Sequence, residues 1–80
     1  MKNQEEKIAF LKKAYEIAAE YNPKSPFSVN INPRELGKQM GYGESRIVEI
    51  VSELIKDGYA TSTLGMHSFF VTKLGGLFLN

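Results

Sequence analysis

The chain has 80 residues, of which 42% are apolar and 24% charged, and this predicts one small soluble domain, residues 1–80, with a limited core. It has no cysteine and one histidine, which excludes disulfides and argues against a zinc site, so we expect no metal and no other cofactor. The chain has no apolar run that could span a membrane, so we expect it in the cytoplasm. Its net charge of +1 predicts little non-specific attraction to nucleic acid.

Residues 3–21 predict an amphipathic helix with an unusually wide apolar face. Apolar side chains cover about half of the helical wheel, whereas an ordinary surface helix has an apolar stripe of roughly 100°. Lys7 is the one charge on this apolar side. Two interpretations are open: the helix is buried across its own domain, or part of it meets a second subunit. The second interpretation makes three of its residues candidate dimer contacts: Phe10, Ile17 and Tyr21.

Residues 22–26 contain two prolines and end this helix in an extended turn. Residues 27–31 then alternate apolar and polar, which predicts a short strand. Its inward-facing side chains are Phe27, Val29 and Ile31.

Asn32 and Pro33 predict the start of a helix that ends near Met40. Asn32 can cap free backbone N–H groups, and proline suits the first helical position. Gly37 in the middle of this helix lowers the stability of the helix by about 1 kcal/mol relative to alanine. Close approach of another helix would explain why a glycine is present there. Gly41 ends the helix, with an expected positive φ.

Residues 44–57 predict a longer amphipathic helix, which Gly58 ends. Strands are expected at residues 59–63 and 68–72, with a hairpin turn at residues 64–67 between them. Thr72 can cap one further helical turn, or the last residues form only a short tail. Either way an apolar end remains, which is a second candidate dimer surface: Leu77, Phe78 and Leu79.

The segment LGKQMGYGESRIVEIVSELIKDGYAT, residues 36–61, resembles the winged helix-turn-helix family of DNA-binding domains. It is most similar to small prokaryotic regulators and to the core of MarR-like proteins. The resemblance rests on apolar helix positions, on the turn between the helices, and on the returning strand: Leu36, Met40, 41–43, Ile47, Val51, Leu54, 57–59 and 68–75. It implies an α+β fold in the order helix, strand, helix, helix, strand, strand.

This resemblance implies a DNA-binding transcriptional regulator, with residues 44–57 in the major groove of double-stranded DNA and the hairpin as a wing. We expect a homodimer, because one nearly neutral domain makes few phosphate contacts. The polar arc of residues 44–57 holds three acids and two bases, so DNA contacts are expected near the N-terminal ends of the two helices. The candidate DNA-binding residues are Arg34, Lys38, Ser45, Arg46, Lys73 and His67.

The alternative function is a protein–protein interaction module of the same fold that does not bind DNA. The acids of residues 44–57 and the apolar wing tip with Leu64 and Met66 favour this alternative. Tyr42 in the turn has two interpretations, as a partly buried core residue or as a phosphate contact. No catalytic constellation is present, since the chain lacks cysteine, a second histidine and a glycine-rich phosphate loop, so we do not expect an enzyme.

Overall fold

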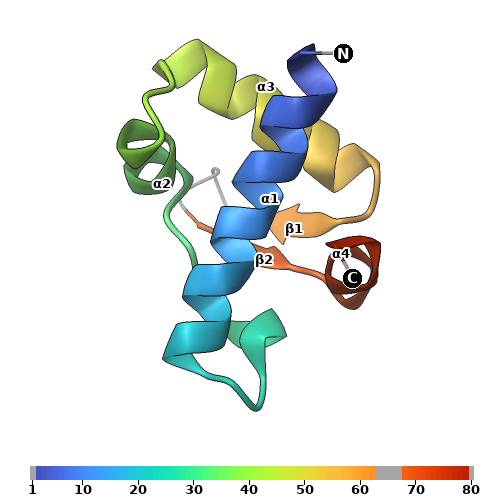
Figure 1. The fold of residues 1–80 in the computed structure, drawn as a ribbon. Helices are drawn as coiled ribbons and strands as arrows, with labels where there is room; N and C mark the ends of the chain where they lie inside the picture. The colour runs from blue at the N-terminus through green and yellow to red at the C-terminus, as the bar shows by residue number, and fades with distance from the viewer. Residues whose placement is uncertain (1, 63–67, 80) are drawn as a thin grey trace.

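The computed structural model of the chain describes residues 2–62 and 68–79. These residues form four α-helices and a small antiparallel sheet, arranged as in Figure 1, which confirms the predicted α+β class. The elements, in chain order, are α1 (Lys2–Tyr21), the 3₁₀ helix η1 (Pro26–Ser28), α2 (Pro33–Gln39), α3 (Glu44–Lys56), β1 (Ala60–Ser62), β2 (Phe69–Val71) and α4 (Lys73–Leu79).

The sheet consists of β1 and β2, which pair antiparallel with Ala60 opposite Val71 and Ser62 opposite Phe69. Both strands were predicted; β1 begins one residue later than expected, and β2 is two residues shorter. The turn predicted at residues 64–67 lies outside the described residues. In β2 the side chains alternate, so that Phe69 and Val71 enter the core while Phe70 is half-buried.

The prediction of a strand at residues 27–31 is wrong. Pro26 begins a 3₁₀ turn, and the Ser28 hydroxyl donates a hydrogen bond to the Ser25 carbonyl at 3.1 Å, which stabilises the turn. Only Ile31 joins the sheet, by exchanging two 2.9 Å backbone hydrogen bonds with Phe69. The proline and the serines therefore favour local hydrogen bonds over a longer ladder.

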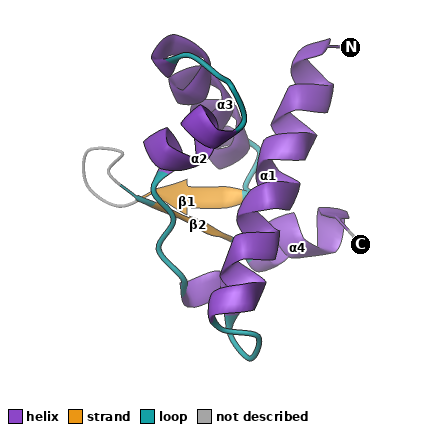
Figure 2. Cartoon of the chain, turned by 60° about the vertical axis from the view of Figure 1, so that its left-hand side comes forward, coloured by secondary structure: helices purple, strands orange, loops and turns teal. Residues whose placement is uncertain are grey.

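Most of the wide apolar face of α1 is covered within the chain itself. Figure 2 shows α1 running beside the other helices and the sheet, and it contacts α3, η1, α2, β2 and α4. Phe10 is completely buried and its ring stacks on Phe69, with 5.8 Å between the centroids. The prediction that Phe10 contacts a second subunit is therefore wrong, because no part of this side chain reaches the surface. Ile17 is partly buried, and Tyr21 is 83% exposed.

The predicted start of α2 is confirmed. Asn32 Oδ1 accepts hydrogen bonds from the backbone N–H groups of Arg34 and Glu35, at 3.0 and 3.3 Å, and Pro33 occupies the first position. Gly37 lies against α3, where a Cβ would overlap the side chain of Ile47, so the expected close approach of a second helix is confirmed.

Positive φ angles end α2 and α3. Gly41 and Gly58 both have φ of 83°, a conformation that side-chain-bearing residues rarely adopt. These two turns set the path of the chain into and out of α3. They therefore help to fix α3 relative to α2 and the sheet.

The last described residues form a helix, which settles the alternative left open between a helical turn and a tail. The Thr72 hydroxyl accepts a hydrogen bond from the Gly75 N–H at 3.1 Å and donates one to the Gly58 carbonyl at 2.6 Å. Gly75 packs against the backbone of Tyr59, and a Cβ there would collide with its carbonyl oxygen. Three apolar side chains of α4 remain exposed in part, Leu74, Leu77 and Phe78, although the Phe78 ring also stacks on Tyr59 with 4.5 Å between the centroids.

Candidate nucleic-acid interface

A hollow of about 330 Å³ lies between α2 and the beginning of α3. Arg34 and Lys38 stand one helical turn apart on α2, and both border this hollow with exposed side chains. Gly43, at the N-cap of α3, provides no side chain to bond the free N–H groups of the first turn. Two cations and the positive end of a helix therefore face the same space, an arrangement suited to a phosphate group.

The cations of this hollow are free to exchange partners. Arg34 pairs with Glu44 at 3.0 Å, but both side chains are 69% exposed, and such surface pairs contribute about 0–1 kcal/mol. No ion-pair partner of Lys38 lies among the described side chains. A phosphate can therefore compete with Glu44 for Arg34 at little cost.

Tyr42 is a partly buried core residue, which confirms one of the two interpretations given to it. Its side chain is half-buried and packs against the hydrophobic core, and it also lines the hollow beside Lys38. The ring therefore forms part of the wall against which a bound group would rest.

Arg46 does not face the hollow. Its Nε donates a hydrogen bond to Glu6 of α1 at 2.7 Å, and its Nη1 donates one to Glu49 at 3.1 Å. The hydrogen bond to Glu6 is the largest cause that raises the pKa of Arg46 above its usual value, and burial acts in the opposite direction. The structure therefore places Arg46 against α1, away from Arg34 and Lys38.

Lys7 makes a second connection between α1 and α3. Its Nζ lies 2.8 Å from Asp57 Oδ2 and 3.5 Å from Glu53 Oε1. The ion pairs of Glu6 and Lys7 together form what we call the α1–α3 clamp. The position of Lys7 on the apolar side of α1 was the only signal of the clamp in the sequence.

The Lys7 pairs are expected to stabilise the fold only while Lys7 is protonated. The hydrogen bond to Asp57 raises the pKa of Lys7 above its ordinary value of 10.5, so the stabilisation is complete below about pH 10.5 and is lost as the pH rises through the folded-state pKa. Lys7→Gln should lower the free energy of unfolding by about 0.5–1 kcal/mol near pH 8, and by less near pH 12. Urea unfolding of both proteins at the two pH values measures this difference. A difference of equal size at both would contradict the pairing.

The other predicted DNA-binding residues are dispersed. Ser45 is exposed in the first turn of α3, next to the hollow. Lys73 is exposed at the start of α4, which lies on the opposite side of the molecule from α2 in both Figures 1 and 2. His67, like Leu64 and Met66, lies outside the described residues.

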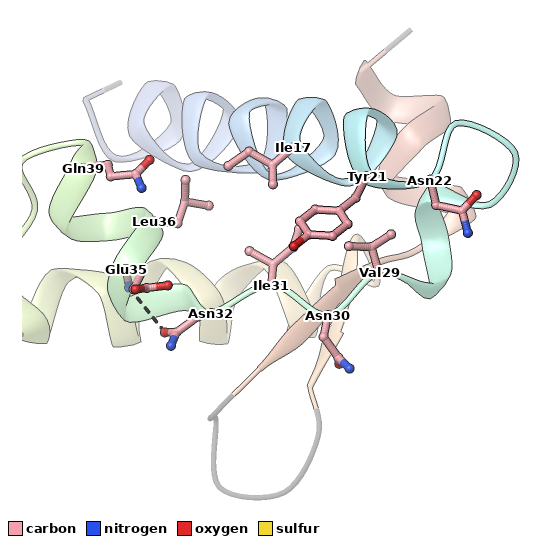
Figure 3. A pocket seen from close by; sticks show the side chains of 10 residues that line it. All are labelled: Ile17, Tyr21, Asn22, Val29, Asn30, Ile31, Asn32, Glu35, Leu36 and Gln39. Carbon is pink, nitrogen blue, oxygen red and sulfur yellow. Dashed lines mark hydrogen bonds between the residues drawn. The ribbon is translucent and has the colours of Figure 1, made fainter.

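A second hollow, of about 640 Å³, lies between the C-terminal half of α1, residues 29–32 and α2. Figure 3 shows apolar side chains such as Ile17 and Leu36 at its centre, with amide side chains around them. Among the described side chains that line it, Glu35 is the only charge. This hollow therefore has the wrong charge for nucleic acid.

No described helix is long and apolar enough to cross a membrane. Comparisons of the chain with protein-family models, with curated proteins and with solved structures found no significant match.

Proposed function

We propose that this chain is a winged-helix domain that binds double-stranded DNA and regulates transcription as a homodimer. The observation that carries the proposal is the hollow between α2 and α3, where Arg34 and Lys38 stand beside the positive end of α3. In this geometry α2 lies along a DNA strand and its cations contact phosphates, while α3 enters the major groove. Phosphate contacts position a protein on DNA and provide much of its affinity.

The α1–α3 clamp holds three acids of α3 and its C-terminal end in ion pairs outside the hollow. Glu53 and Asp57 share Lys7, and Glu49 shares Arg46 with Glu6, so the clamp reduces the charge of these acids without cancelling it. Unpaired, these three carboxylates would repel the DNA backbone. None of the three lines the hollow, where Arg34 and Lys38 stand beside a single acid, Glu44, so the lining of the hollow keeps a net positive charge.

The exposed apolar residues support a protein contact as well. Leu77 of α4 is 72% exposed and Phe78 is partly exposed beside it, while Leu79 is half-buried. A homodimer through α4, with Ile17 and Tyr21 as further candidates, would double the number of phosphate contacts. The same apolar face favours the alternative function, an interaction module that does not bind DNA. Duplex binding by the dimeric protein distinguishes the two.

Removing the cations of the hollow is expected to weaken binding to every DNA sequence alike. Arg34→Ala and Lys38→Ala should each reduce the slope of log K against log[salt] by about 1, because each removes one phosphate contact. Fluorescence anisotropy of a labelled duplex between about 25 and 200 mM salt measures the slope. The control is Lys24→Ala, which removes the same charge from an exposed position in the loop after α1.

The proposal fails if the dimeric protein does not bind duplex DNA at about 50 mM salt. If it binds but Lys24→Ala changes the slope as much as Lys38→Ala does, the DNA lies elsewhere. Mass measurement in solution, by light scattering, establishes the oligomeric state on which both tests depend.

A further inference from the structure

We infer that α3 selects thymine through the side chain of Val48, so that the preferred DNA sites carry a thymine methyl group opposite the second turn of α3. This inference rests on the proposed DNA binding and extends it from phosphate contact to sequence preference. It follows from which sides of α3 the rest of the protein already occupies.

Three sides of α3 contact other parts of the protein. Its inner side is buried in the core, at Ile47, Ile50, Val51 and Leu54. On one flank the α1–α3 clamp holds Arg46, Glu53 and Asp57. On the other flank α2 contacts α3, through Gly37 against Ile47 and through the ion pair of Arg34 with Glu44.

The remaining side of α3 is what we call the outward face. At 3.6 residues per turn, its positions are those furthest from the buried stripe. All of them are exposed: Ser45, Val48, Glu49, Ser52 and Lys56. Glu49 stands at the edge nearest α1 and is paired with Arg46, the centre of the face carries Ser45, Ser52 and Lys56, and Val48 stands at the other edge, toward Glu44.

Val48 is the apolar side chain of this face, and 48% of it is exposed. Ser45 and Ser52 precede and follow it by three and four positions, so small hydroxyl groups flank it on the helix surface. Glu44, four positions before it, is its charged neighbour on this side of α3, and Glu44 is paired with Arg34 of α2. A valine has no hydrogen-bonding group, so it cannot read the donor and acceptor pattern of a base pair.

Thymine is the base that such a side chain can recognise. In the major groove thymine alone presents a methyl group, at C5, and apolar side chains contact it. The flanking serines can bond to several bases and are therefore less selective. Between Ser45 and Ser52, Val48 is thus the residue of the outward face with the clearest preference for one base.

The test removes the methyl group from the DNA and its partner from the protein. Sites selected from randomised duplexes by the dimeric protein should contain one position enriched in thymine. Replacing that thymine by deoxyuridine removes only the methyl group, and this should weaken binding by the unmodified protein about fourfold, the loss expected for one buried methyl group. For Val48→Ala the same replacement should change binding little.

Ser52→Ala is the matched control, because it alters the same face and leaves Val48 in place. With this variant, replacing thymine by uracil should still weaken binding. Val48→Thr keeps one methyl group and the branched shape, so it should retain part of this loss of affinity. Circular dichroism verifies that each variant is folded. Equal binding of the thymine and uracil duplexes by the unmodified protein would overturn this inference while leaving DNA binding intact. Absence of any duplex binding would instead overturn the proposed function.

Discussion

Phe69→Ala is expected to lower the free energy of unfolding by about 3–5 kcal/mol, which is the usual cost of truncating a buried phenylalanine. Phe69 is completely buried, stacks on Phe10 of α1, and exchanges backbone hydrogen bonds with Ile31. Domains are typically stable by about 5–15 kcal/mol, and a chain of 80 residues has a small core, so most of the stability would be lost. Thermal and urea unfolding followed by circular dichroism measure the change.

The neighbouring residue provides a matched control. Phe70→Ala removes the same side chain from the opposite side of β2, where it is half-buried and absent from the core cluster. Phe70→Ala should lower the free energy of unfolding by less than half as much as Phe69→Ala, because the loss depends on how deeply the removed atoms are buried. Equal losses for the two variants would show that the pattern of inward and outward residues in β2 is wrong.

Gly75→Ala is expected to lower the free energy of unfolding by about 3 kcal/mol, although alanine is the better helix former. Its Cβ would collide with the carbonyl oxygen of Tyr59, and a backbone atom cannot move aside as a side chain can. For a domain of this size the midpoint of thermal unfolding should fall by about 12–24 °C. Differential scanning calorimetry measures this shift.

Gly43→Ser is the corresponding control for a glycine with space around it. No atom lies within 4 Å of the place that a Cβ on Gly43 would occupy, and its φ of −76° suits any residue. Because serine is preferred over glycine at an N-cap, stability should stay constant or rise by a few tenths of a kcal/mol. If Gly75→Ala were equally harmless, α4 would not dock against Tyr59 as described.

Features that depend on neighbouring residues could be predicted from the sequence. The Asn32 cap, the positive φ of Gly41 and the burial of Ile47 and Leu54 each follow from residue types within one or two helical turns. The alternation of apolar and polar residues at 27–31 led to a wrong prediction of a strand. Pro26 and the adjacent serines form a turn with local hydrogen bonds, which hydrophobic periodicity does not represent.

The candidate site was predictable only in part, for a similar reason. Arg34 and Lys38 share a face of α2 because of their spacing, and the structure brings both to one hollow. The direction of Arg46 depends on Glu6, which is 40 positions away in the sequence. No periodicity reveals such a pair, so the sequence did not show that Arg46 is turned toward α1 and does not line the hollow.

The hydroxyl group of Thr72 has a consequence for regulation. One hydrogen bond joins it to Gly58, directly after α3, and another joins it to Gly75 of α4. The helix proposed to read DNA and the helix proposed to hold a second copy therefore meet at a single side chain. Any energetic coupling between the two binding events is reciprocal: if assembly through α4 strengthens DNA binding by some factor, DNA strengthens assembly by the same factor.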